Sequence, residues 1–94
     1  MRVIGGKFKG KKLIEPKDKE TRPLKDLTKE SIFNIINHSN KFSINLKKAQ
    51  ILDLFSGVGS FGIECLSQGA SHVTFIEKYE AVLSILKKNL DNLK

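Results

Sequence analysis

The sequence predicts an α/β fold in which two parallel strands alternate with two helices in the order β-α-β-α. Two short apolar runs, residues 50–54 and 72–76, carry an acidic residue at or just after their ends, Asp53 and Glu77. A glycine-rich turn and a helical stretch closed by Gly69 lie between the two runs. At these lengths, this order implies a right-handed crossover between parallel strands.

The helices are predicted from apolar residues at helical spacing. One is expected over residues 24–39, with Pro23 suited to its entry, one over 60–68, and one over 79–93. The apolar positions are Leu24, Leu27, Ile32, Ile35 and Ile36 in the first helix, and Val82, Leu83, Leu86, Leu90 and Leu93 in the last. A parallel sheet needs several strands with helices on both faces. The sequence therefore predicts the front half of a larger doubly wound domain.

The N-terminal segment is predicted to be a basic β-hairpin. Two short extended stretches within residues 2–14 flank a turn that contains three glycines. A charged loop punctuated by Pro16 and Pro23 follows. We therefore expect two parts, a basic hairpin and loop over residues 1–23 and the partial α/β domain over residues 24–94.

The positive charge is concentrated in the first half of the chain. The 94 residues carry a net charge of +7, and residues 1–48 hold 13 Lys and Arg against 5 Asp and Glu. Residues 49–94 hold 4 against 5. Clustered positive charge suggests a polyanionic partner, most simply nucleic acid. A solvated lysine-rich surface is the alternative.

The glycine turn predicts a cofactor site. Residues 57–62 satisfy the GxGxxG pattern, and glycines allow a ligand to lie against the backbone at the start of a helix. Glu77 would accept hydrogen bonds from ribose hydroxyls. Asp53 would repel the pyrophosphate of a dinucleotide and attract an ammonium, which favours S-adenosylmethionine over NAD. A tight turn that only packs well is the alternative.

Other site chemistries find little support in the sequence. The single Cys65 excludes an intramolecular disulfide and is expected to pack as a small hydrophobe. The isolated histidines indicate no metal site. No apolar run is long enough to cross a bilayer, and the N-terminus lacks an apolar signal core. We therefore expect a cytoplasmic protein without a metal.

The motifs resemble one family in detail. The chain is similar to the RsmD family of 16S rRNA guanine-N2 methyltransferases, which are class I S-adenosylmethionine-dependent enzymes with a Rossmann-like sheet. The glycine-loop residues Asp53–Ser60 and Gly62–Glu64 match the first motif of the class as a whole. The segments that resemble RsmD specifically are Arg2–Leu13, Thr21-Arg22-Pro23, Lys29-Glu30 and Phe33-Asn34-Ile35.

The resemblance implies roles for particular residues. Asp53, the backbone from Phe55 through Ser56 and Gly57 to Gly59, and Glu77 would hold S-adenosylmethionine. The basic segment around Phe8 would contact 16S rRNA or a small-subunit assembly particle. Its candidate RNA-binding residues are Arg2, Lys7, Phe8, Lys9, Lys11, Lys12 and Arg22. From the residues alone, Arg22 could equally pair with Asp18 or Glu20.

The sequence also departs from the family. Family members carry an Asn/Asp-Pro-Pro-Tyr/Phe motif that grips the target guanine, whereas the only prolines here are Pro16 and Pro23. We therefore expect the base pocket to be missing, and the chain alone to be catalytically inactive. A truncated domain, a degenerate relic and a fragment completed by another chain all remain open. The open edge of the sheet would also favour self-association.

Overall fold

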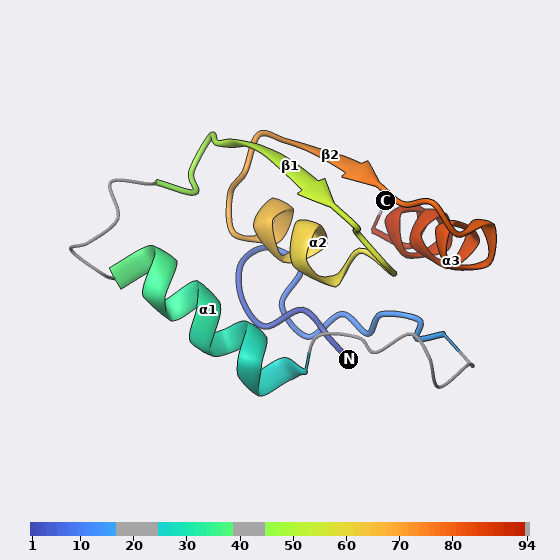
Figure 1. The fold of residues 1–94 in the computed structure, drawn as a ribbon. Coiled ribbons are helices and arrows are strands. Elements are labelled where there is room, and N and C mark those ends of the chain that lie inside the picture. Colours follow the sequence, from blue (N-terminus) through green and yellow to red (C-terminus); the bar gives the residue numbers. More distant parts are fainter. Residues whose placement is uncertain (17–24, 39–44, 94) are drawn as a thin grey trace.

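The computed structural model describes residues 1–16, 25–38 and 45–93, and it has the predicted α/β architecture. The elements lie in the order α1, β1, α2, β2 and α3 along the chain (Figure 1). Their bounds are α1 Asp26–His38, β1 Gln50–Leu54, α2 Ser60–Ser67, β2 His72–Ile76 and α3 Glu80–Asp91. The predicted strands match residue for residue, and the predicted helices match to within two residues at each end.

β1 and β2 form a two-stranded parallel sheet, as the crossover rule predicts. Ile51 pairs with Val73, and Asp53 pairs with Phe75. These residues face α2, which lies against one face of the sheet, while α3 follows beyond the carboxyl end of β2 (Figure 1). The carboxyl ends of both strands therefore meet at one edge of the sheet, where ligands bind in open α/β folds.

α2 lies between two small apolar clusters and forms the centre of the molecule. On one side Cys65, which is fully buried, packs with Phe33, Leu46 and Val73. On the other side Ile63, also fully buried, packs with Val3 and Leu13 of the N-terminal segment. Burial, together with the nearby Asp53 and Glu64 carboxylates, raises the pKa of the Cys65 thiol to about 12. Cys65 is thus a packed small hydrophobe, as predicted.

The buried face of α1 differs from the predicted apolar stripe. Leu27 is 75% exposed and Ile35 is 53% exposed, whereas Phe33 and the charged Lys29 are buried. This face of the helix is buried because the Lys29 ammonium pairs with the Glu64 carboxylate in the core. Leu24 lies outside the described residues. In α3 the prediction holds, since Val82 and Leu86 are buried and Leu90 packs against the core.

The predicted N-terminal β-hairpin is formed only in part. Residues 1–16 form a loop closed by one antiparallel bridge between Arg2 and Lys12, not a pair of strands. Backbone hydrogen bonds join Val3 to both Lys11 and Gly10. The loop folds this way because it is anchored on α2: its Lys7 amide donates to the carbonyl of Ser67 at 2.9 Å. Docking on α2 therefore accompanies a short antiparallel pairing across the loop, in which the Leu13 amide also donates to the Met1 carbonyl at 3.0 Å.

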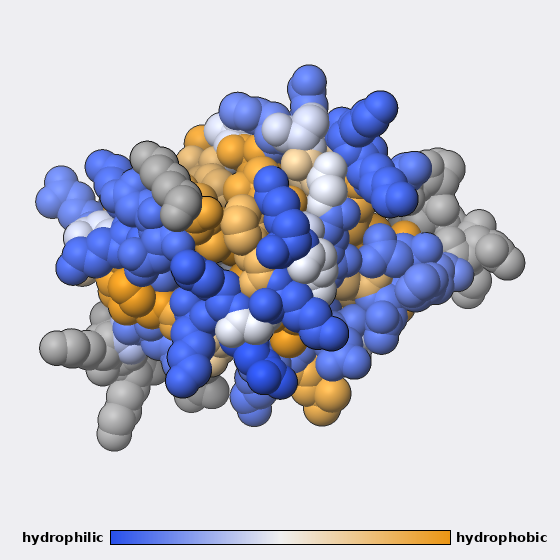
Figure 2. Space-filling model, turned by 180° about the vertical axis from the view of Figure 1, so that it is seen from behind, coloured by the Kyte–Doolittle hydropathy of each residue, from blue (hydrophilic) through white to orange (hydrophobic). Residues whose placement is uncertain are grey.

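The second face of the sheet is open. Leu52, Leu54 and Ile76 are 61%, 56% and 49% exposed, and alternation along the paired strands places them on the face opposite α2. The view from behind shows apolar side chains reaching the surface among hydrophilic ones (Figure 2). Self-association through this sheet stays a prediction. Within the described residues, every helix is too short and too polar to span a bilayer.

Candidate functional site

The candidate site begins at the turn that joins β1 to α2. Three residues of the turn, Phe55, Gly57 and Gly59, have positive φ angles of 58°, 60° and 94°. Alternate residues in this conformation reverse the chain within a few positions and bring the first turn of α2 beside the end of β1. Phe55 is a non-glycine residue in this region and is 91% exposed, so its backbone and its ring both stand at the open edge.

The three glycines of the GxGxxG pattern have different structural roles. A Cβ on Gly59 would lie 2.4 Å from a Leu86 methyl carbon, and one on Gly62 would lie 2.3 Å from the Phe75 ring. Gly57 is different, because a Cβ there would meet nothing within 4 Å. Packing therefore explains Gly59 and Gly62, whereas Gly57 presents bare backbone to open space where a ligand could lie.

Asp53 lies beneath the turn with its carboxylate aimed at α2. The residue is 9% exposed, and its Oδ2 accepts a hydrogen bond from the Gly62 amide at 3.2 Å. Burial raises the pKa of this carboxyl, and the Gly62 hydrogen bond opposes that shift in part. A buried anion with a single amide partner is a strong anchor for a cation, because little water competes for it.

The Ser56 hydroxyl links the ends of the two strands through hydrogen bonds. Its Oγ donates to the Asp53 carbonyl at 2.6 Å and accepts from the Ile76 amide at 3.0 Å. The Ser56 amide also donates to the Ile76 carbonyl at 2.8 Å. The hydroxyl, the amide and the carbonyl of Ser56 are therefore all hydrogen-bonded within the protein, and its role in cofactor binding stays a prediction.

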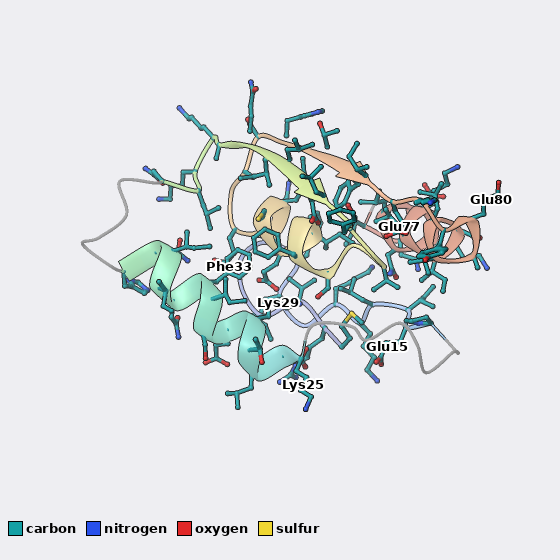
Figure 3. The ribbon with its side chains drawn as sticks, in the orientation of Figure 1. Glu15, Lys25, Lys29, Phe33, Glu77 and Glu80 are labelled. Carbon is teal, nitrogen blue, oxygen red and sulfur yellow. The ribbon has the colours of Figure 1, made fainter. Side chains whose placement is uncertain are left out.

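Glu77 reaches from the end of β2 to the glycine turn. Its Oε1 accepts from the Gly57 amide at 2.8 Å, and its Oε2 accepts from the Tyr79 amide at 2.9 Å. Figure 3 places Glu77 where β2 leads into α3. A carboxylate has about four lone-pair positions, so each oxygen can accept one further hydrogen bond. Asp53 and Glu77 thus lie at the two sides of one turn, as their spacing in the sequence predicted.

The basic residues of the N-terminal loop lie at the surface. Arg2, Lys7, Lys9, Lys11 and Lys12 are all exposed. Phe8 is half-buried against the Val3, Leu13 and Ile63 cluster, and the Lys7 Nζ lies 5.0 Å from its ring centroid. Base stacking on Phe8 therefore has only part of the ring available, and it stays a prediction. Arg22 lies outside the described residues.

A buried ion pair, which the sequence reasoning missed, connects the basic loop to α1 and α2. The Lys29 Nζ lies 3.2 Å from Glu64 Oε1, with both side chains fully buried, and it donates to the Arg2 carbonyl at 2.7 Å. It also donates to Ser60 Oγ, the first residue of α2, at 3.1 Å. The available signal was Lys29 itself, four residues before the buried Phe33 and thus on the same helix face.

Glu64 completes this network by holding the loop backbone. Its two oxygens accept from the amides of Ile4 at 2.8 Å and Gly5 at 3.0 Å. α2 therefore connects the two candidate sites physically: its first turn borders the cofactor turn, and its middle holds the basic loop. Within the described residues, no group of three or more His, Cys, Asp or Glu could hold a metal ion.

The chain is similar to known proteins along its whole length. Ribosomal RNA small subunit methyltransferase D of Escherichia coli is 39% identical over 94 residues, which are all of this chain and 44% of that protein. Its counterpart in Haemophilus influenzae is 38% identical over 94 residues, again all of this chain and 46% of that protein. The chain thus spans about half the length of the curated relatives it matches.

Solved structures show the same fold. A candidate methyltransferase from Escherichia coli, yhhF, aligns with a TM-score of 0.81 and 36% identity over 99% of this chain and 46% of that one. A hypothetical protein of Thermus thermophilus aligns with a TM-score of 0.78 and 27% identity over 97% and 48% of the two chains. The family model described as conserved hypothetical protein 95 matches residues 1–94. The chain therefore belongs to this methyltransferase family, that of the RsmD proteins its sequence resembles.

Proposed function

We propose that this chain supplies the cofactor-binding half of an S-adenosylmethionine-dependent enzyme that methylates the exocyclic N2 of a guanine in 16S rRNA. The observation that carries the proposal is the buried Asp53 carboxylate beneath a turn that leaves Gly57 open. S-adenosylmethionine carries an ammonium and a ribose but no phosphate, so it suits a site with an acidic residue on either side. A cytoplasmic location would follow from the rRNA substrate.

The residues fit such a cofactor in chemistry and in placement. The Asp53 carboxylate would hold the ammonium, the free lone pairs of Glu77 would accept the ribose hydroxyls, and the backbone at Gly57 would border the ligand. When bound, the cofactor supplies an electrophilic methyl group. These residues contribute orientation, because holding the donor aligned with the incoming amine accounts for much of the rate in such displacements.

A nicotinamide-binding Rossmann enzyme is the first alternative. Asp53 argues against it, since a buried carboxylate at the start of α2 would repel a pyrophosphate placed there. A non-catalytic RNA-binding fragment is the second alternative. It would bind rRNA with a steep salt dependence and would ignore both cofactors. Calorimetry with S-adenosylmethionine, S-adenosylhomocysteine and NAD separates the three functions. Only the proposed function predicts binding heat from S-adenosylmethionine and S-adenosylhomocysteine and none from NAD.

The basic loop is proposed to dock 16S rRNA or a small-subunit particle through Arg2, Lys7, Lys9, Lys11, Lys12 and Arg22, with Phe8 among them. The chain alone is expected to transfer no methyl group and to bind cofactor weakly at most, because the motif that grips the guanine is absent from its sequence. Incorporation of labelled methyl into small-subunit rRNA by the 94-residue chain would contradict this expectation.

Alanine should cost less stability at Gly57 than at Gly59. Gly57→Ala should cost about 1 kcal/mol of stability, from the positive φ alone, and should block cofactor binding by adding a methyl group to the open surface. Gly59→Ala should cost more, because its Cβ would overlap Leu86 as well. Urea unfolding and cofactor titration on both variants check this contrast. Equal losses of stability would contradict it.

Asp53→Asn should stabilise the free protein and weaken the cofactor complex. The pKa of Asp53 is raised in the fold, so the protonated carboxyl favours the folded state. This contribution to stability is complete at low pH and is lost as pH rises through the raised pKa. The asparagine variant should therefore be the more stable protein at pH 7, with an advantage that shrinks as pH falls. Thermal unfolding between pH 4 and pH 8 measures this difference.

The same substitution should lower affinity for S-adenosylhomocysteine by about ten- to hundredfold at pH 7, the loss typical of a charged hydrogen bond. Affinity of the wild-type protein should also fall as pH drops through the raised pKa of Asp53, whereas the asparagine variant should lack this dependence. An unchanged affinity in the variant would remove Asp53 from the site.

A further inference from the structure

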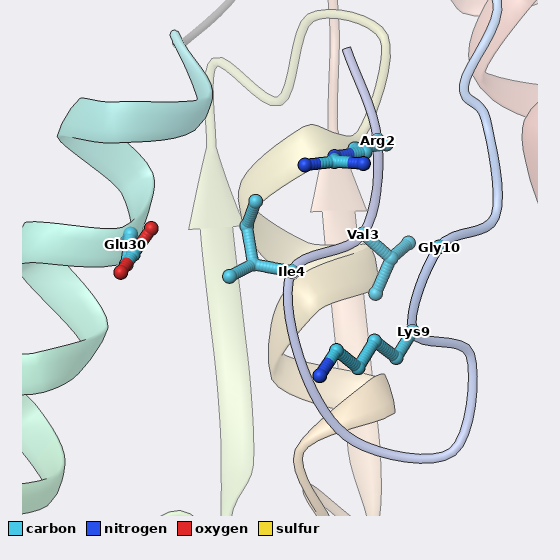
Figure 4. Close-up of a pocket in the computed structure, with 6 residues that line it drawn as sticks. All are labelled: Arg2, Val3, Ile4, Lys9, Gly10 and Glu30. Atoms are coloured by element: carbon cyan, nitrogen blue, oxygen red, sulfur yellow. The ribbon is translucent and has the colours of Figure 1, made fainter.

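A pocket lies between the N-terminal loop and α1. It has a volume of about 370 Å³ and is lined by Arg2, Val3, Ile4, Lys9, Gly10 and Glu30 (Figure 4). The volume is within the range of small-molecule sites. Its described lining includes no residue of the glycine turn, so it is separate from the cofactor site.

The loop wall of this pocket is held in place before any ligand arrives. Val3 is 1% exposed, and its amide and carbonyl bond to Lys11 and Gly10 across the loop. The Ile4 amide is fixed by the buried Glu64 at 2.8 Å. The Arg2 amide donates to Asp26 at 3.2 Å, which ties this wall to the first turn of α1. The pocket is therefore preorganised on the side that carries its cations.

The charges of the pocket are of both signs and partly unpaired. Within the described part of the chain, Lys9 and Glu30 have no ion-pair partner, and Arg2 has only a loose contact, 3.8 Å, with Asp26. Glu30 lies on α1 opposite Ile4 in Figure 4. A bare phosphate suits the two cations but is repelled by the carboxylate. The ligand that fits must carry an anion and, apart from it, a group of N–H donors.

A nucleotide has this combination, and guanine has it most fully. An ionised carboxylate only accepts hydrogen bonds. Guanine presents N1–H and N2–H side by side, one for each carboxylate oxygen, whereas uracil presents a single N–H between two carbonyls that a carboxylate repels. Unpaired bases in RNA are read on this edge. The half-buried Ile4 side chain between the charges would contact the base.

We propose that this pocket binds one unpaired guanine nucleotide of the RNA, with its phosphate at Arg2 and Lys9 and its Watson–Crick edge at Glu30. This proposal rests on the proposed function, since it assumes an RNA substrate. The bound nucleotide is a docking nucleotide, and the base to be methylated would lie at the glycine turn. Glu30 thereby gives a basic loop, which by itself binds any RNA, a preference for sequence.

The test is an NMR titration of the labelled protein with guanosine 5′-monophosphate and uridine 5′-monophosphate. The amides of Ile4, Gly10 and Glu30 should shift with the guanine nucleotide, which should bind about tenfold tighter than the uridine nucleotide. Glu30→Gln should abolish that preference. Glu80→Gln, which neutralises an exposed carboxylate on α3, should keep it (Figure 3). Lys9→Ala should weaken both nucleotides equally.

Three results would overturn the proposal: equal affinity for both nucleotides, an unchanged preference in Glu30→Gln, or the same amide shifts with inorganic phosphate alone. A parallel titration with S-adenosylhomocysteine separates this proposal from the proposed function. If S-adenosylhomocysteine shifts the glycine turn but guanosine 5′-monophosphate does not shift the pocket, the guanine site alone is refuted. Absence of shifts at the glycine turn would refute the cofactor assignment, whatever the nucleotides do.

Discussion

Lys29→Met should lower the free energy of unfolding by about 3–5 kcal/mol, the cost of leaving one charge of a buried pair without its partner. The substitution keeps the apolar stem and removes the ammonium that contacts Glu64, Ser60 and the Arg2 carbonyl. Glu64 would remain fully buried with its charge uncompensated. A small domain has roughly 5–15 kcal/mol of stability, so much of it would be lost. Urea unfolding followed by circular dichroism measures the change.

Lys25→Met is the matched control for this substitution. Lys25 lies just before α1 and is exposed, whereas Lys29 points from α1 toward α2 (Figure 3). The control should change stability by less than about 0.5 kcal/mol. A double variant, Lys29→Met with Glu64→Gln, should recover part of the loss, because no buried charge is left over. Similar stabilities for Lys25→Met and Lys29→Met would show that the pair is unimportant.

Gly6→Ala should destabilise the protein by about 3–5 kcal/mol, from a strained backbone and a steric overlap together. Gly6 has a φ of +80°, and a Cβ there would lie 1.8 Å from the carbonyl oxygen of Ser67. The obstructing atom belongs to the backbone of α2, so the overlap cannot be relieved without lifting the loop from that helix. The hydrogen bond from the Lys7 amide to that carbonyl would be lost as well. The same urea unfolding measurement applies.

Gly10→Ala separates strain from overlap. Gly10 has a similar φ of +87°, but a Cβ there would meet nothing within 4 Å. This variant should therefore cost only about 1–2 kcal/mol, the strain of the left-handed conformation. If the loop docks rRNA as proposed, Gly6→Ala should also weaken RNA binding, because it lifts the loop from α2. Equal stability losses at the two positions would refute docking of the loop on α2.

The sequence predicted the structure correctly where a single local pattern determines it. The bounds of β1 and β2 were predicted closely, because turn residues on both sides of each short apolar run limit where a strand can begin and end. The positions of Asp53 and Glu77 followed, since parallel strands end at the same edge. The sequence could not predict that Gly59 is required by packing and Gly57 is not, because this difference depends on where Leu86 of α3 packs.

The prediction was incomplete where distant residues outweighed the local pattern. The basic loop keeps one antiparallel bridge, while Glu64 and Ser67 of α2 accept hydrogen bonds from other amides of the loop. The stripe assigned to α1 treated Lys29 as a surface residue, because burial of a lysine requires a partner that its neighbours in sequence do not reveal. That partner is 35 positions later in the chain, within the glycine-loop motif.

The central claim is that the turn between β1 and α2 holds S-adenosylmethionine. An NMR titration of the 94-residue chain with S-adenosylhomocysteine tests it most directly, since it maps even weak binding to individual amides. The account predicts shifts at residues 53–62 and at Glu77, absent in Asp53→Asn at the same concentration, and no comparable shifts with NAD. Shifts at the turn with NAD alone, or none with S-adenosylhomocysteine at millimolar concentration, would contradict it.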